Sequence, residues 1–298
     1  KKQMKKLSGH IIDVVSKKII EGTVTMENGR IISIVTSDKV DDQYRLPGLV
    51  DAHIHIESSM MLPSEFARLS APHGTVACVS DPHEIANVCG VKGIEYMIEN
   101  GKKSPVKFYF AAPSCVPATG FETSGAILDA GEIESLMKNP DIFCLGEMMN
   151  FPGVLYNDEQ VLLKLKAAKD SGKPIDGHAP DLSNNRLKKY VSSGISTDHE
   201  CMSISEAGEK ISLGMKIIIR EGSAAKNFDT LIPLIEKYPD DIMFCSDDKH
   251  PDDLLKNGHI NSLVRRAVSK GFNFMDVIRA CSYNPVKHYK LNTGLLQT

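Results

Sequence analysis

The stretch LPGLVDAHIHIESSM, residues 46–60, joins a short apolar run to two histidines that lie one residue apart. If the run forms a β-strand that persists to its end, His53, His55 and Glu57 project to the same side, because side chains alternate along a strand. Two imidazoles then share one small volume. Neutral imidazole is the commonest metal ligand, so one interpretation is a metal site. The other is a pair of surface histidines at the end of a strand, and the rest of the chain decides between them.

Seven further short apolar runs follow and alternate with longer segments of helical pattern. Together with the first, they cover residues 48–55, 74–81, 106–112, 141–147, 173–178, 194–199, 215–221 and 241–247. The helical segments are 63–73, 90–101, 130–140, 157–172, 182–194, 203–214, 227–238 and 259–271. This alternation indicates βα units and a parallel sheet. Eight units in about 250 residues predict an α/β fold of the (β/α)8 TIM-like barrel type, with an open doubly wound sheet as the competing architecture.

The first 46 residues have a different pattern. Short β-branched runs occupy residues 9–15, 22–26 and 29–35, and Asn28–Gly29 between the last two is a strong hairpin signal. We therefore predict a small β domain over residues 1–46 and a barrel over residues 47–298. A sheet of three strands needs a partner to cover its apolar face.

Composition excludes several classes of function. The 298 residues carry a net charge of −3, so the chain has no general attraction to nucleic acid or to an anionic membrane. The N-terminus KKQMKKLSGH is basic, but no apolar segment of a signal peptide follows it. No apolar segment reaches the length of a membrane span. The seven cysteines are scattered and form no C-x-x-C pair, which argues against a disulfide framework and a zinc ribbon. We expect a cytoplasmic protein.

Potential metal ligands recur where the apolar runs end. In a parallel barrel these ends meet at one mouth, where catalytic groups lie. A single buried histidine is as often structural as functional, but four histidines converging with two carboxylates indicate a site for two metal ions. The residues are His53, His55, Glu147, His178, His199 and Asp247.

This arrangement predicts hydrolytic chemistry. One ion would be held by His53 and His55 and the other by His178 and His199, with the carboxylates bridging the ions or completing their coordination. Two ions roughly 3.5–4 Å apart can share a hydroxide that is a nucleophile near neutral pH. Asp247 is the candidate to take and return its proton. The nitrogen and oxygen donors suit Fe(II), Mn(II) or Zn(II).

The motifs also carry a family resemblance. The segment PGLVDAHIHIESSM is similar to the first-strand signature of the amidohydrolase superfamily. Within that superfamily the chain most resembles the bacterial adenine deaminases, over roughly residues 47–290. The motifs that carry this resemblance include HIHIESSM, PHGTVACVSDPHEIANVCG, PSCVPATGFETSGA, GEMMNFPGV, KPIDGHAP, GISTDHE, IREGSAAKN and FCSDDKHPDDLLKNGHI.

The resemblance implies hydrolytic deamination of adenine to hypoxanthine and ammonia at two divalent ions, with Mn(II) or Fe(II) ahead of Zn(II). It implies that Glu147 bridges the ions where many relatives use a carboxylated lysine. Asp247 would be both ligand and proton shuttle. The resemblance also points to six substrate-binding candidates, each of which could equally cap a helix or a loop. They are His83, Glu84, Ser114, Glu200, Arg220 and Ser223.

The chain departs from this family in length. Adenine deaminases continue well past a motif like CSYNPVKHYKL at residues 281–291, so we expect that the C-terminal region is lacking here and that the β domain is incomplete. Exposed sheet edges make a homo-oligomer possible. Two alternatives stay open. One is another amidohydrolase that acts on a different aminopurine or a cyclic amide, and the other is an inactive metal- or purine-binding fragment.

Overall fold

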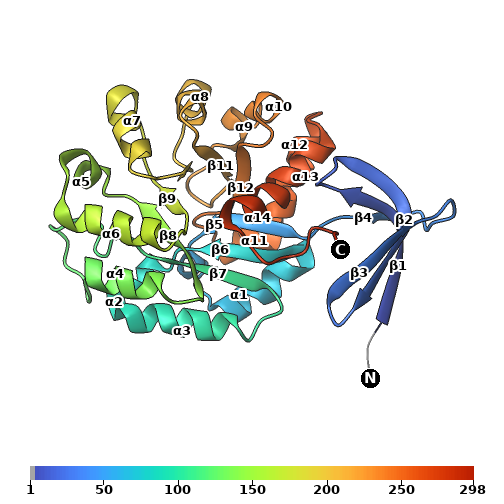
Figure 1. Cartoon of the computed structure of the whole chain (residues 1–298), viewed down its shortest axis with the longest axis horizontal. Helices are drawn as coiled ribbons and strands as arrows, with labels where there is room; N and C mark the ends of the chain where they lie inside the picture. The colour runs from blue at the N-terminus through green and yellow to red at the C-terminus, as the bar shows by residue number, and fades with distance from the viewer. Residues whose placement is uncertain (1–3) are drawn as a thin grey trace.

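The computed structural model describes residues 4–298. A small β-sheet at the N-terminus lies beside a ring of strands that is surrounded by helices (Figure 1). The ring holds the eight apolar runs predicted as strands. They are β5 (Leu49–Ile54), β6 (Thr75–Ser80), β7 (Lys107–Ala112), β8 (Ile142–Met148), β9 (Ile175–Gly177), β10 (Thr197–Asp198), β11 (Lys216–Arg220) and β12 (Ile242–Cys245).

The eight strands close into a barrel. Parallel pairing gives the orders β5-β6-β7-β8-β9 and β10-β11-β12. The backbone N–H of Ser196 donates to Ile175 (2.9 Å) and joins the two sheets on one side. On the other side, the N–H of Asp247 donates to His53 (3.0 Å) and that of His55 to Asp247 (3.4 Å). The barrel prediction is confirmed, and the open-sheet alternative is wrong because the last strand pairs with the first.

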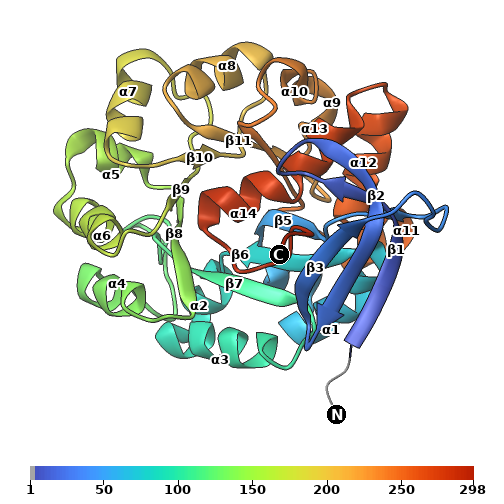
Figure 2. The ribbon, with the colours of Figure 1, turned by 45° about the vertical axis from the view of Figure 1, so that its right-hand side comes forward.

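Helices follow the strands around the outside (Figure 2). They are α1 (Pro63–Ser70), α2 (His83–Cys89), α3 (Val91–Gly101), α4 (Ala130–Met137), α5 (Phe151–Tyr156), α6 (Glu159–Asp170), α7 (Asn184–Ser192), α8 (Ile204–Ser212), α9 (Phe228–Leu231), α10 (Leu234–Lys237), α11 (Pro251–Asn257), α12 (Ile260–Ser269), α13 (Phe274–Ala280) and α14 (Tyr283–Tyr289). Short 3₁₀ turns occupy Ile56–Ser59 and Ala71–His73.

Two local predictions were wrong. The single helix expected over residues 227–238 is divided into α9 and α10, because Pro233 has no N–H with which to continue the helical hydrogen bonds. The side chains of residues 53, 55 and 57 were also expected to project to the same side, and this is wrong for residue 57. Strand β5 ends at Ile54 and a 3₁₀ turn follows, so Glu57 leaves the alternation and accepts a hydrogen bond from the N–H of Ile85 (3.2 Å).

The barrel interior is apolar where the strands begin. Val50, Ala77 and Met243 are buried there, and they belong to one cluster with Tyr289 and Leu291. Helix α14 lies in the middle of the ring in Figure 2 and covers this end. The Tyr289 hydroxyl reaches inward and donates to Asp176 Oδ1 (2.9 Å). Polar groups therefore gather at the opposite end, where the strands finish.

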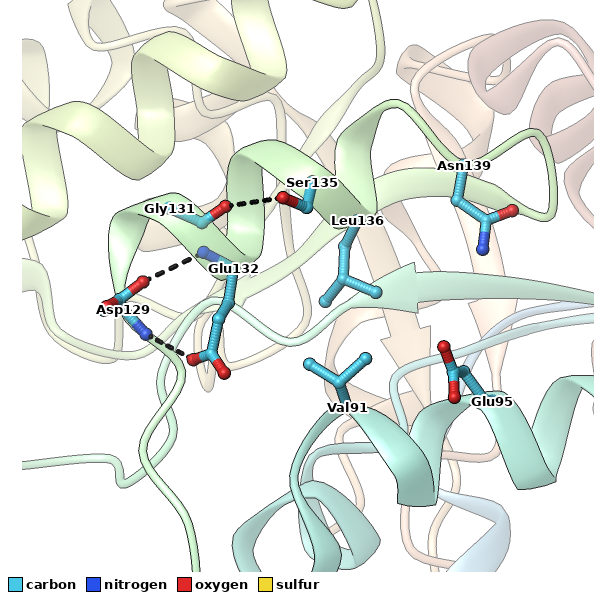
Figure 3. A pocket seen from close by; sticks show the side chains of 8 residues that line it. All are labelled: Val91, Glu95, Asp129, Gly131, Glu132, Ser135, Leu136 and Asn139. Carbon is cyan, nitrogen blue, oxygen red and sulfur yellow. Dashed lines mark hydrogen bonds between the residues drawn. The ribbon is translucent and has the colours of Figure 1, made fainter.

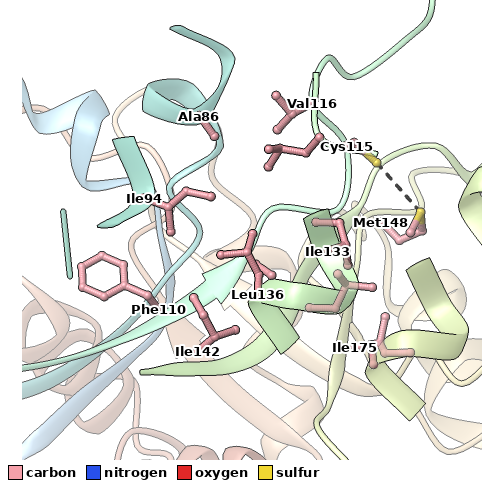
Figure 4. Packing of buried hydrophobic residues seen from close by; sticks show 14 of the residues in the cluster. Ala86, Ile94, Phe110, Cys115, Val116, Ile133, Leu136, Ile142, Met148 and Ile175 are labelled. Atoms are coloured by element: carbon pink, nitrogen blue, oxygen red, sulfur yellow. Dashed lines mark hydrogen bonds between the residues drawn. The ribbon is translucent and has the colours of Figure 1, made fainter. Parts of the chain in front are cut away.

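A second apolar layer joins the strands to the outer helices (Figure 4). Ile94 of α3, Ile133 of α4, Phe110 of β7 and Ile142 of β8 pack there, each at most 1% exposed. Burial of each such side chain stabilises the fold by about 1.5–3 kcal/mol. This packing fixes the strand ends in place.

The N-terminal sheet comprises β1 (Met4–Asp13), β2 (Lys18–Glu27), β3 (Arg30–Thr36) and β4 (Tyr44–Arg45), in the order β3-β2-β1-β4. The predicted hairpin is confirmed. Asn28 and Gly29 have φ angles of 51° and 76°, as a two-residue type I′ turn requires. Ile12 and Val14 pack against Ile278 of α13, so one face of the sheet is covered by the barrel. Within residues 4–298, no helix has both the length and the apolar character to cross a bilayer.

Candidate metal centre

The two histidines of the opening motif face one another. Their Nε2 atoms lie 3.0 Å apart, and both side chains are buried. His53 belongs to β5, and His55 follows its last residue. The Nδ1 of His55 lies 3.0 Å from the carbonyl oxygen of Asp81, which fixes the orientation of the ring and directs Nε2 into the site.

Glu147 lies between two groups of histidines. It belongs to β8, and its Oε1 lies 3.1 Å from His55 Nε2 and 4.0 Å from His53 Nε2. Its Oε2 lies 2.7 Å from His178 Nδ1 and 3.3 Å from His199 Nε2. Each oxygen therefore serves a different pair of imidazoles, which is the geometry that a bridging carboxylate needs.

Asp247 closes the site from the last strand. Its Oδ1 lies 3.6 Å from His53 Nε2 and 3.4 Å from His55 Nε2, while its Oδ2 accepts a hydrogen bond from Arg220 (2.8 Å). The φ angle of Asp247 is 51°, in the left-handed region that aspartate tolerates better than most residues. This backbone conformation lies directly after β12.

The electrostatics of the site couple acids to imidazoles. Burial would raise the pKa of Glu147, but hydrogen bonds from His178, His199 and His55 lower it well below its ordinary value. The pKa of Asp247 is likewise lowered against the effect of burial, by hydrogen bonds from His53 and His55. Burial would lower the pKa values of His55 and His199, yet the neighbouring carboxylates raise both well above the ordinary value.

These donors fit divalent metal ions. Nitrogen and oxygen ligands that share one tetrahedral ion lie roughly 3.3–3.6 Å apart. The donor-atom separations given above run from 2.7 to 4.0 Å. The groups whose donor atoms all lie within 4.8 Å of one another include His53, His199 and Asp247; His53, His55 and Glu147; and Glu147, His178 and His199. His83 forms two further groups of this kind, one with His55 and Glu84 and one with Asp81 and Glu147. All six predicted ligands are therefore brought together. His199 lies with His53 as well as with His178, so the assignment of one histidine pair to each ion stays a prediction.

His83 and Glu84 border this centre from the first turn of α2. His83 Nδ1 lies 3.6 Å from Glu147 Oε1, and Glu84 Oε1 lies 3.6 Å from His55 Nδ1. The side chains of His83 and Glu84 are 17% and 35% exposed, compared with 2% for His53. They form the open side of the centre together with His178, whose side chain is 27% exposed. The centre is therefore most accessible from this side.

Glu200 and Arg220 form an ion pair with one another. Arg220 donates through both terminal nitrogens to Glu200, with Nη2 3.0 Å from Oε2, and its Nη1 also donates to Asp247. Glu200 Oε1 lies 3.3 Å from His199 Nε2. Burial opposes ionisation of Glu200, but His199 and Arg220 lower its pKa to about 2. The guanidinium of Arg220 therefore links Asp247, the candidate proton shuttle, to Glu200, a predicted substrate-binding residue.

The two predicted serines are engaged elsewhere. The Ser114 hydroxyl donates to the carbonyl oxygen of Glu147 (2.6 Å) and is buried. The Ser223 hydroxyl accepts from the N–H of His250 (2.8 Å) and its own N–H donates to Asp248 (2.7 Å). Ser114 thus holds the chain around Glu147, and Ser223 joins the loops that follow β11 and β12.

The sequence reasoning missed a buried network that supports the ligands. Asp51 Oδ2 lies 2.7 Å from His259 Nε2 and accepts from the Ser246 hydroxyl, while its Oδ1 accepts from the N–H of Ser246 (3.0 Å). His259 Nδ1 lies 2.7 Å from the Thr75 hydroxyl. This network fastens β5 to β12 just before His53 and Asp247. The Asp–x–His–x–His order in the first run could have indicated Asp51, but its partner lies 208 residues away.

A hollow of about 400 Å³ lies outside the barrel between α3 and α4 (Figure 3). Two of the carboxylates that line it, Asp129 and Glu132, cap α4 through reciprocal bonds of 2.9 and 3.1 Å. It contains none of the predicted site residues. The metal centre therefore stays the candidate site for chemistry.

Comparisons with known proteins agree with this geometry. The model of the amidohydrolase family matches residues 44–298. The chain is 56% identical over 294 residues to the adenine deaminase of Methanosarcina mazei, a match that covers 99% of this chain and 53% of that protein. It is 56% identical over 291 residues to the adenine deaminase of Sulfurovum sp., with 98% and 54% covered. For the adenine deaminase of Borreliella burgdorferi the identity is 53% over 298 residues, again with 98% and 54% covered. The chain spans about half the length of these relatives.

Solved structures share the fold at low sequence identity. N-acetyl-D-glucosamine-6-phosphate deacetylase from Mycobacterium smegmatis has a TM-score of 0.70 at 11% identity, covering 98% of this chain and 92% of that one. A dihydroorotase has a TM-score of 0.63 at 17% identity, covering 97% and 84%. These likenesses concern the fold alone.

Proposed function

Because this chain belongs to the amidohydrolase family, we propose that it catalyses the hydrolytic deamination of adenine to hypoxanthine and ammonia. The substrate is suggested by the curated relatives, which are named adenine deaminase and are 48–56% identical to this chain. The chemistry is supported by one observation above the others. Glu147 directs one oxygen to His55 and the other to His178 and His199.

We assign two divalent ions to the centre, Mn(II) or Fe(II) in preference to Zn(II), because every donor is an imidazole nitrogen or a carboxylate oxygen and none is a thiolate. His53, His55, His178 and His199 would hold the ions with Glu147 between them, and Asp247 would complete the set. When bound, such ions lower the pKa of water enough to supply a nucleophile at neutral pH.

Asp247 is our candidate for moving the proton. Its lowered pKa keeps it deprotonated at neutral pH, the form that accepts a proton from the attacking water. One oxygen faces the histidines and the other is held by Arg220, so the carboxylate cannot rotate away. The same oxygen that takes the proton can deliver it to the departing amine.

The purine would bind on the open side of the centre. His83 and Glu84 offer a ring nitrogen and a carboxylate there, which match the acceptors and N–H donors on the edge of adenine. Glu200 and Arg220 border the reacting atoms from the opposite strands. Ser114 and Ser223 would act by holding Glu147 and the two loops in place.

The partner is then a small molecule, with no nucleic acid and no membrane required. We place the protein in the cytoplasm, in accord with its seven free cysteines.

A substrate panel tests the proposal. The chain, loaded with Mn(II), is assayed for ammonia release from adenine, from other aminopurines and from cyclic amides. Adenine should be the best substrate, and Glu147→Gln should abolish turnover. The exposed Glu95→Gln makes the same change of charge outside the centre and should leave turnover intact. A cyclic amide as best substrate, or full activity of Glu147→Gln, would overturn the proposal.

A further inference from the structure

A second hollow, of about 330 Å³, lies apart from the metal centre and carries a strong positive charge. Five cations and one carboxylate contribute to its lining: Lys226, Lys249, Lys256, Arg265, Arg266 and Glu221. Arg266 pairs with Glu221 and Asp229, and Lys256 lies 3.6 Å from Asp252. Within residues 4–298 the other three cations make no ion pair, and their charges favour an anion in this space.

Its position in the barrel is distinctive. Glu221 and Lys226 lie in the loop after β11, and Lys249 lies in the loop after β12. These are the seventh and eighth strands of the barrel. Phosphate sites in TIM barrels are frequently formed by the loops after these two strands, together with a short extra helix. The hollow shares these two loops, but it meets the short helix α11 at its C-terminal turn, where Lys256 lies, and not at its N-terminus.

The walls of the hollow are held in place. Arg266 Nη1 lies 2.7 Å from Glu221 Oε1, Arg266 Nη2 lies 2.9 Å from Asp229, and the guanidinium lies 4.2 Å from the ring of Phe228. Arg265 donates to the carbonyl oxygen of Asn257 (3.1 Å). A site held in this way loses little conformational freedom when a ligand binds.

Lys249 gives the strongest indication of a ligand. It is 4% exposed, and its ammonium donates to the carbonyl oxygen of Glu221 (3.2 Å). Within residues 4–298 its ammonium makes no ion pair, although a buried charge is costly unless an opposite charge accompanies it. An anion in the hollow would supply that charge.

We propose that this hollow binds a small anion with one or more phosphoryl groups, of nucleotide size or smaller. Lysine and arginine are the side chains that bind phosphate, and a volume of about 330 Å³ lies within the usual range for small-ligand sites. Adenine, hypoxanthine and ammonia carry no phosphate, so the proposed reaction does not require this site. Anion binding in this hollow is therefore independent of that reaction.

Isothermal titration calorimetry tests the proposal. The chain is titrated with inorganic phosphate, pyrophosphate and UMP at constant ionic strength, with sodium chloride as the reference. UMP presents a nucleotide without the adenine base, so it separates binding here from binding at the metal centre. We expect saturable one-to-one binding of at least one phosphate compound, and the tightest of the three identifies a free phosphate or a nucleotide as the ligand.

Paired charge variants locate the binding. Lys226 and Arg265 are exposed, so Lys226→Gln with Arg265→Gln should fold normally and weaken binding at least tenfold, by about 1.4 kcal/mol or more. The exposed pair Lys138→Gln and Lys166→Gln removes the same charge elsewhere and should leave binding unchanged. Absence of saturable binding to the unaltered chain overturns the proposal, as does equal weakening in both double variants.

Discussion

At the scale of single residues, the candidate chemistry depends on how carboxylates meet imidazoles. Glu147 spans two histidine groups, and Asp247 joins His53 and His55 to Arg220. Each carboxylate is buried, and each is kept ionised by hydrogen bonds that outweigh the cost of its burial.

Asp247→Asn should remove proton transfer without disturbing the fold. Asparagine adopts the left-handed backbone of this position as readily as aspartate, so the change isolates the charge. We expect kcat to fall by about 10²–10⁴. Turnover, circular dichroism and bound metal are measured together. Unaltered kcat with two ions bound would exclude Asp247 as the proton shuttle.

Metal binding should release protons. The raised pKa values mean that His55 and His199 hold protons in the metal-free protein at neutral pH, and a metal must displace them. Affinity should therefore rise with pH until the raised pKa values are passed, and become constant above them. Addition of Mn(II) in weak buffer with a pH indicator should show acidification at pH about 7 that fades as the starting pH is raised. No acidification at neutral pH would contradict the ionisation states described here.

Most ligands could be predicted from sequence because they follow strand ends, where a parallel barrel brings side chains together. His178 and His199, for example, are each the last residue of a short apolar run. The pairing of Arg220 with Asp247 and Glu200 could not be predicted, because it depends on the loop geometry after three strands. The contact between Asp51 and His259 was also hidden, since it joins distant parts of the chain.

At the scale of elements, the predicted ligands lie on or directly after the barrel strands, and groups on the adjacent strands and loops fix their positions. The alternation of runs predicted all eight strands, while five helices lie outside the helical segments that it indicated: α2, α5, α11, α13 and α14. Proline divided one predicted helix, and a 3₁₀ turn ended the alternation after His55. The break between α9 and α10 and the end of β5 therefore depend on local backbone geometry, which apolar periodicity does not predict.

Two glycines in different elements give a matched test of packing. A Cβ on Gly146 in β8 would lie 2.2 Å from Asp81 Oδ2, the oxygen that accepts the N–H of Glu147 (3.0 Å). Gly146→Ala should lower the free energy of unfolding by about 1–3 kcal/mol and impair turnover. A Cβ on Gly208 in α8 meets no atom within 4 Å, so Gly208→Ala should raise that free energy by up to about 1 kcal/mol.

Urea denaturation of the two glycine variants measures both effects. The free energy of unfolding should fall in Gly146→Ala and rise in Gly208→Ala, because a Cβ at Gly146 meets a carboxylate and a Cβ at Gly208 meets open space. Equal stabilities of the two variants would show that Asp81 can move away without cost. Turnover of Gly208→Ala should equal that of the unaltered chain.

At the scale of the whole molecule, α14 closes the barrel at one end and leaves the metal centre at the other. The N-terminal sheet packs through Ile12 and Val14 on α13. The division of the chain at residue 46 and the possible homo-oligomer stay predictions. Because the chain spans about half the length of its curated relatives, the activity assigned here belongs to the proposal.

If this chain holds two metal ions that together support deamination, its activity should follow the number of ions bound. The chain is stripped of metal and titrated with Mn(II) from zero to about three equivalents, while adenine consumption is followed by ultraviolet absorbance and bound metal is counted. If two ions act together, activity should saturate near two equivalents per chain. Saturation at one equivalent, or two ions bound without turnover, would contradict it.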